Sequence, residues 1–240
     1  MSPRIMRYIN LVRRFRDQLF PKTYGDNQIE IDKNLLGKVR LNIVGKNNRI
    51  YLSNIVCNPH TYIYISIFGN QNQVSLDRVY VGNEMRVIIG QSHPNFGMVR
   101  HTSLKIGKGS SIESMRCISF NSNTTCEIGE NCMISSDVTL WNTDAHSVLE
   151  LQTGKVLNWV KGIRIGEHCW LGEKSSVLKN SVIPDDCIIG YNEVVSGHLK
   201  KSHAAYAGNP AVLVKEGITW DSNGAKHGYI DNDGGEACSS

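Results

Sequence analysis

The residues best suited to chemistry are an aspartate and a histidine two positions apart, within the segment 141–146 (WNTDAH). This segment breaks the hydrophobic pattern around it, as expected of a site exposed at the edge of a fold. Imidazole titrates near neutral pH, so His146 could act as a general base. If the chain is extended here, Asp144 points to the same side and could fix the imidazole tautomer. The alternative for Asp144 is an ordinary turn aspartate.

Trp170 is the second candidate, because it directly precedes Leu171, an inward position of the repeat described below. Alternation along a strand predicts that Trp170 points outward. A bulky exposed indole requires a partner, either a ligand or another subunit.

A metal site is the other chemistry that these histidines could support. His168 could join His101 and His146, but no other histidine lies within ten residues of His146. His198 and His203 are closely spaced, but they lie near the closing end of the repeat. No CxxC pair suggests zinc. We therefore expect no bound metal.

The element that must position these residues is predicted by a six-residue repeat. Neither a helix nor a free strand has this period, whereas a coil of short strands repeats the same inward residue on each flat side. Glycines follow several repeat positions, where a Cβ would obstruct a tight turn. The pattern predicts a triangular β-helix. The repeat positions are Ile165, Leu171, Val177, Ile183, Ile189 and Val195.

The repeat extends upstream with interruptions. Ile106, Ile112 and Ile118 form one run, and Ile128, Ile134 and Leu140 form another. Further upstream, residues 43–52 and 67–76 match at an offset of 24, which predicts wider coils of the same solenoid. Two unrelated hairpins are the alternative.

Composition bounds the class of protein. The chain has 240 residues, is 40% hydrophobic and carries a net charge of +4, which is too small to argue for nucleic acid. No apolar stretch approaches the roughly 20 residues that span a bilayer. The seven cysteines are an odd number, and Cys132, Cys169 and Cys187 occupy inward positions. They are typical of reduced core residues in a cytoplasmic protein.

The two ends differ from the middle. Residues 1–22 predict an amphipathic helix with a basic face, which either caps the solenoid or holds residues 1–20 weakly at the inner membrane surface. Residues 23–220 form the predicted β-helix domain, with a loop at 147–162. Residues 221–240, rich in Gly, Asp, Asn and Ser, predict a disordered, irregular tail.

Four segments together resemble the hexapeptide-repeat acyltransferases, most closely the capsule, lipopolysaccharide and sialic acid O-acetyltransferases. They cover about half of the chain and lie in the family's order. The segments are 143–147 (TDAHS), 165–172 (IGEHCWLG), the ladder to Ser196, and 207–211 (AGNPA), with 218–220 (ITW) beyond.

The resemblance implies an all-β, left-handed parallel β-helix, a homotrimer with active sites between subunits, and acetyl-CoA as the donor. It also implies that His146 is the catalytic base, assisted by Asp144, and that Trp170 lines the acetyl-CoA cleft. Asn121, Asn123 and Trp159 are the expected acceptor-binding residues. The expected cofactor-binding residues are Trp170, Ser196, Gly197, Ala207, Gly208, Lys201 and Lys215.

The expected activity is acetyl-CoA-dependent O-acetylation of a sugar hydroxyl on a cell-surface polysaccharide or its precursor. A sugar-nucleotide N-acetyltransferase, or another small-molecule acetyltransferase, is the alternative within the enzyme class. A non-catalytic binding solenoid is the alternative outside it.

Overall fold

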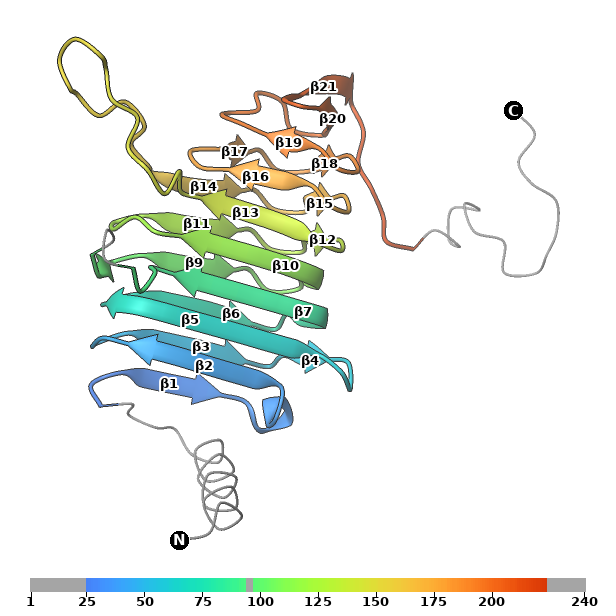
Figure 1. Cartoon of the computed structure of the whole chain (residues 1–240). Coiled ribbons are helices and arrows are strands. Elements are labelled where there is room, and N and C mark those ends of the chain that lie inside the picture. Colours follow the sequence, from blue (N-terminus) through green and yellow to red (C-terminus); the bar gives the residue numbers. More distant parts are fainter. Residues whose placement is uncertain (1–24, 94–96, 224–240) are drawn as a thin grey trace, which may run out of the picture.

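The chain forms a stack of triangular coils, ordered from the N-terminal to the C-terminal end (Figure 1). The computed structural model describes residues 25–93 and 97–223, and nearly all their regular structure is β-strand, apart from one 3₁₀ turn, η1 (Lys33–Leu35). The helix predicted for residues 1–22 lies outside the described residues, as does the predicted tail from residue 224. No helix within the described residues is long and apolar enough to cross a membrane.

One side of the stack is a parallel sheet of seven strands, in which each strand pairs with the equivalent strand of the next coil. In spatial order these are β1 (Gln28–Ile31), β3 (Arg49–Ser53), β6 (Gln73–Asp77), β9 (Ser103–Ile106), β11 (Thr125–Ile128), β14 (Gly162–Ile165) and β17 (Val182–Ile183).

A 14-stranded sheet makes the other two sides. Its strands are β2 (Val39–Val44), β4 (Val56–Cys57), β5 (Tyr62–Asn70), β7 (Tyr80–Ile89), β8 (Val99–Arg100), β10 (Ser111–Ser119), β12 (Met133–Ile134), β13 (Val138–Asn142), β15 (Trp170–Leu171), β16 (Ser176–Leu178), β18 (Cys187–Ile189), β19 (Val194–Val195), β20 (Ala204–Gly208) and β21 (Ala211–Glu216). The two sides are continuous because β10 pairs first with β12 and then with β13. An antiparallel β20–β21 pair ends the sheet.

The six-residue repeat is confirmed as the inner ladder, because every repeat position from Ile165 to Val195 is at most 1% exposed. The small side chains between them, such as Cys169 and Ser175, are fully buried at the corners. Gly172 shows why a side chain is excluded there: a Cβ would lie 2.5 Å from the carbonyl oxygen of Gly190 in the next coil.

The cysteines in the described residues are free thiols. A hydrogen bond to Cys169, together with burial, raises the pKa of the Cys132 thiol well above its ordinary value. The hydrogen bond with Cys132 favours the Cys169 thiolate, but contact with Cys187 and burial outweigh it and raise the pKa of Cys169 to about 12. Both side chains are therefore protonated core residues at neutral pH.

The offset of 24 is also confirmed, since Ile43 lies beside Ile67 and Leu52 beside Leu76 in neighbouring coils. The assignment of Ile118 to the inner ladder is wrong. The corner from Ile112 to Met115 is one residue shorter than the equivalent corner in the next coil, so Cys117 takes the inward position. Ile118 instead pairs with Trp141 in an outward column.

Candidate active site

A constrained turn follows β13 and carries the candidate base. Ala145 has a left-handed backbone (φ 60°), and the His146 N–H donates to the carbonyl oxygen of Asp144 at 2.6 Å, which closes a γ-turn. A non-glycine residue in this conformation is strained and requires support from its surroundings. Asp144 and His146 are therefore related by a turn, and the extended geometry considered from the sequence is not formed.

Two polar side chains support this turn. The hydroxyl of Thr143, only 1% exposed, accepts the Ala145 N–H at 2.9 Å and donates to Asn121 Oδ1 at 2.9 Å. The Asn158 amide donates to Asp144 Oδ2 at 2.6 Å and to the His146 carbonyl oxygen at 2.8 Å. Sequence reasoning missed both, because neither is unusual in type or spacing.

The carboxylate of Asp144 also forms an ion pair with Lys179, with 3.2 Å between Oδ2 and Nζ. Lys179 follows β16 in the next coil and is only 19% exposed. The pair ties the turn to the solenoid, so Asp144 holds the turn in place.

The turn lines a small pocket of about 170 Å³ that brings together several predicted residues. His146, Asp144 and Asn121 meet Trp159 there, and the indole of Trp159 is 70% exposed. Trp159 belongs to the loop between β13 and β14, the yellow segment that projects from the stack in Figure 1. Asn123 does not line this pocket; it occupies a left-handed corner position (φ 58°), and its N–H donates to the Arg100 carbonyl oxygen.

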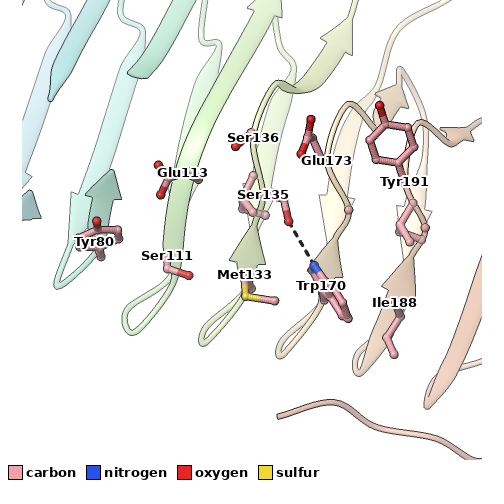
Figure 2. A pocket seen from close by; sticks show the side chains of 14 residues that line it. Tyr80, Ser111, Glu113, Met133, Ser135, Ser136, Trp170, Glu173, Ile188 and Tyr191 are labelled. Carbon is pink, nitrogen blue, oxygen red and sulfur yellow. Dashed lines mark hydrogen bonds between the residues drawn. The ribbon is translucent and has the colours of Figure 1, made fainter. Parts of the chain in front are cut away.

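Trp170 lies at a different pocket, of about 580 Å³ (Figure 2). It points outward and is half-buried, and its Nε1 donates to Ser135 Oγ at 3.2 Å. Within one chain, Trp170 and His146 thus line separate pockets at opposite ends of the side formed by β13 and β16. The pocket is lined by Tyr80, Ser111, Glu113, Met133, Ile134, Ser135, Ser136, Trp170, Gly172, Glu173, Ile188, Ile189, Gly190 and Tyr191.

The residues predicted to bind the cofactor lie beyond this pocket, at the C-terminal end of the solenoid. Gly190 lines the pocket, and its N–H donates to the carbonyl oxygen of Tyr206, so Ala207 and Gly208 follow along the same corner. The Gly208 N–H donates to the Glu193 carboxylate.

The other predicted cofactor residues lie near that end but do not line the Trp170 pocket. Ser196 is exposed, and the Gly197 N–H donates to Ser181 Oγ at 3.2 Å. Lys201 forms an ion pair with Glu216 at 3.5 Å, whereas Lys215 is exposed on β21.

His168, the histidine considered for a metal, forms a hydrogen-bonded pair. Its Nδ1 donates to Asp186 Oδ1 at 2.6 Å, and His203 Nδ1 lies 3.7 Å from Asp186 Oδ2. Within the described part of the chain, no three His, Cys, Asp or Glu side chains are placed to hold a metal ion. The Asp186 carboxylate also accepts a hydrogen bond from the Thr219 hydroxyl, at 2.8 Å.

This network predicts an acid-sensitive C-terminal segment. Burial raises the pKa of Asp186, but the hydrogen bonds from His168 and Thr219 outweigh that effect, and the pKa lies below its ordinary value. A pKa that is lower in the folded than in the unfolded state stabilises the folded protein at pH values above the ordinary aspartate pKa of about 3.9. This stabilisation is lost as the pH falls through the folded-state pKa. Tryptophan emission measured from pH 6 to pH 2.5 should therefore change below about pH 4. The Asp186→Asn variant should lose this transition; an unchanged transition would contradict the assignment.

No family model matches this chain, but individual proteins are similar to it. It is 29% identical over 201 residues to a polysialic acid O-acetyltransferase of Neisseria meningitidis. The matched region covers 81% of this chain and 86% of that protein. It is 32% identical over 115 residues to a polysialic acid O-acetyltransferase of Escherichia coli O1:K1, covering 48% of this chain but 35% of that relative.

A solved structure shares the architecture. The polysialic acid O-acetyltransferase OatWY superimposes with a TM-score of 0.62 at 25% identity, covering 82% of this chain and 88% of that one. The chain thus spans most of the Neisseria protein and most of OatWY, but only about a third of the E. coli protein.

Proposed function

We propose that this chain, which folds as a left-handed parallel β-helix, is a hexapeptide-repeat acyltransferase that transfers an acetyl group from acetyl-CoA to a sugar hydroxyl. The acceptor is a capsular or other cell-surface polysaccharide, or its precursor. The observation that carries the proposal is the similarity to the Neisseria polysialic acid O-acetyltransferase, which extends over most of both chains.

The turn at His146 supports a general-base role. A thioester is already activated, so transfer needs a base for the hydroxyl proton and donors for the developing oxyanion. The hydroxyl oxygen attacks the thioester carbonyl carbon as His146 takes its proton. The C–S bond then breaks, and the thiolate of coenzyme A receives that proton. The strained turn fixes the main chain that carries the imidazole at the rim of a pocket.

The donor site requires a neighbouring subunit in this proposal. The pockets of His146 and Trp170 lie at opposite ends of one side, so a threefold arrangement could place one subunit's Trp170 pocket against the next subunit's His146. That side carries an outward apolar column in register, formed by Ile88, Ile118, Trp141 and Leu178. Trp141 is 39% exposed in the single chain, which suits burial against a second copy. We expect sedimentation to give the mass of a trimer.

Replacing Trp170 with alanine should raise the KM for acetyl-CoA about tenfold, with a smaller change in kcat. The reason is that an indole held by Ser135 supplies a rigid wall of the cleft in which the donor binds. Steady-state kinetics at saturating acceptor would measure it. Tyr51→Ala, which removes an outward aromatic side chain from the other sheet, is the matched control. An unchanged KM for acetyl-CoA in Trp170→Ala would contradict the donor role.

The deciding experiment measures coenzyme A release from acetyl-CoA with a panel of capsular and O-antigen glycans. Glycan-dependent turnover that yields an alkali-labile ester supports the proposal, whereas an alkali-stable amide would identify an N-acetyltransferase. A non-catalytic solenoid would show neither turnover nor stabilisation by coenzyme A. A ligand at one hundred times its Kd should stabilise the fold by about 2.7 kcal/mol.

A further inference from the structure

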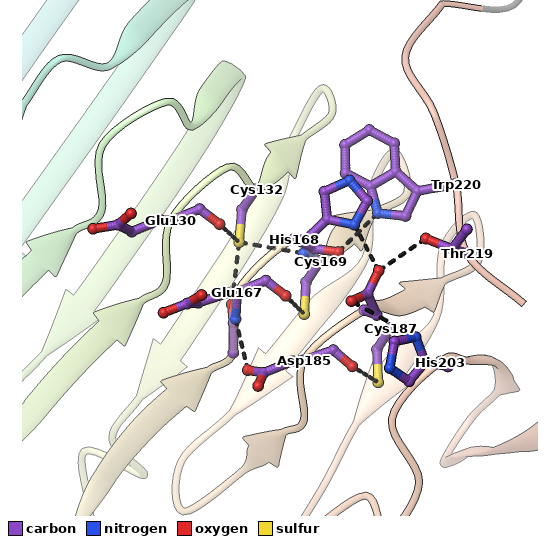
Figure 3. A network of polar contacts seen from close by, with 12 residues as sticks. Glu130, Cys132, Glu167, His168, Cys169, Asp185, Cys187, His203, Thr219 and Trp220 are labelled. Atoms are coloured by element: carbon purple, nitrogen blue, oxygen red, sulfur yellow. Dashed lines mark hydrogen bonds and ion pairs between the residues drawn. The ribbon is translucent and has the colours of Figure 1, made fainter.

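The segment after β21 folds back over the coils and presents a tryptophan at their corner (Figure 3). The indole of Trp220 stacks on the imidazole of His168, with ring centroids 4.5 Å apart and planes 8° apart. Its Nε1 donates to the His168 carbonyl oxygen at 2.8 Å. Stacking and a directional hydrogen bond together fix the plane of the ring.

The chain on either side of this indole is anchored as well. The hydroxyl of Thr219 donates to Asp186, the carboxylate that holds the His168 ring, and the Ile218 N–H donates to the His203 carbonyl oxygen at 3.0 Å. Trp220 is therefore positioned before any ligand arrives. Such preorganisation reduces the entropic cost of binding.

Trp220 lines a third pocket, of about 390 Å³, whose other walls are mainly polar. This pocket shares Ser111 and Met133 with the Trp170 pocket, so the two adjoin. The centroids of the Trp170 and Trp220 rings are 6.2 Å apart. The lining residues are Gly109, Ser111, Asn131, Cys132, Met133, His168, Trp220, Asp221 and Ser222.

We propose that this pocket binds a sugar ring of the acceptor, one unit or more from the hydroxyl that is acetylated, with Trp220 as its platform. An aromatic face with amide, hydroxyl and carboxylate groups beside it matches a sugar ring, which has apolar C–H faces and a rim of hydroxyls. The inference rests on the proposed function, and it implies that the protein recognises more than one sugar unit of the acceptor.

The donor nucleotide is the competing occupant, and the lining argues against it. None of the described residues that line this pocket is Lys or Arg, so no permanent cation meets the phosphates of coenzyme A. Asp221 adds a negative charge instead. The pocket also lies toward the N-terminal coils from Trp170, whereas Gly190 and Ala207 continue the corner in the opposite direction.

The test is the kinetics of Trp220→Ala with an oligosaccharide acceptor. The KM for the acceptor should rise roughly three- to tenfold, the scale of losing one aromatic contact. The KM for acetyl-CoA and the slow hydrolysis of acetyl-CoA without acceptor should not change. Trp220→Phe should restore part of the acceptor affinity, and Val214→Ala, an exposed change on β21, should behave as wild type.

A second variant covers the case in which Trp220→Ala releases the whole segment. Ser222→Trp keeps the Trp220 contacts and fills the pocket from its exposed rim, so it should also raise the KM for the acceptor. Calorimetric titration of oligosaccharide into the His146→Ala protein, with and without Ser222→Trp, measures binding without turnover.

The outcomes separate the two proposals. Unchanged acceptor KM and binding in both pocket variants, with turnover that still depends on His146, would overturn this site and leave the proposed function standing. A rise in the KM for acetyl-CoA alone would assign the pocket to the donor. Failure of wild type to turn over any glycan would instead contradict the proposed function.

Discussion

Replacing His146 with alanine is expected to lower glycan-dependent release of coenzyme A by about 10²- to 10⁴-fold, the usual contribution of a general base. The loss should appear in kcat, because His146 takes the proton in the transition state and takes none when the substrates bind. The turn depends on the main-chain groups of residue 146, which alanine retains: the N–H bonded to Asp144 and the carbonyl oxygen bonded to Asn158. The variant should therefore keep its fold and its donor site. Coenzyme A release at saturating substrates, with thermal unfolding alongside, measures both.

His60→Ala is the matched control, since His60 is an exposed histidine in the turn before β5. Its turnover should equal that of wild type. Turnover that survives His146→Ala would mean that another group is the base. If wild type is inert on every glycan yet hydrolyses acetyl-CoA slowly through His146, the donor site stands and the acceptor is a small molecule.

The inner ladder could be predicted because each inward position depends on local spacing. Hydrophobic residues at every sixth position form the core from Ile165 to Val195, and this spacing does not depend on the conformation of the loops. The prediction was wrong at Ile118, because the preceding corner is one residue shorter and alternation along the strand then reverses the direction of the side chain. One omitted corner residue leaves no mark on composition.

The candidate site was predicted as a set of residues but not as a geometry. Asp144, His146, Asn121 and Trp159 do share a pocket. The left-handed conformation of Ala145 could not be foreseen, because alanine has no preference for it and the neighbouring hydrogen bonds enforce it. The contacts with Asn158 and Lys179 join different coils or opposite ends of a loop, so spacing does not reveal them.

The wide N-terminal coils are held by a column of buried asparagines that includes Asn48 and Asn72, which lie 24 residues apart in neighbouring coils. Asn48 Nδ2 donates to Asn27 Oδ1 at 2.9 Å and to the Gly69 carbonyl oxygen at 2.8 Å. Asn48 Oδ1 accepts both the main-chain N–H and the Nδ2 of Asn72, each at 3.0 Å. The Thr102 N–H continues the column by donating to Asn72 Oδ1 at 3.0 Å. The side-chain oxygens of Asn48 and Asn72 thus each accept a main-chain N–H of the next coil at a buried corner.

Asn48→Ala should therefore destabilise the fold by about 3 kcal/mol, because a buried group left without its partner costs about 1–3 kcal/mol and this change deprives several at once. At roughly 2–4 °C per kcal/mol for a chain of this size, the unfolding midpoint should fall by about 6–12 °C. Scanning calorimetry would measure it. Asn42→Ala is the matched control, since Asn42 is exposed and its Nδ2 donates to Ser66 Oγ in the neighbouring coil, at 3.2 Å. That change should cost less than about 0.5 kcal/mol, as surface substitutions usually do. Equal losses in the two variants would mean that the asparagine column does not stabilise these coils, and that apolar packing of Ile50 and Leu52 alone holds them.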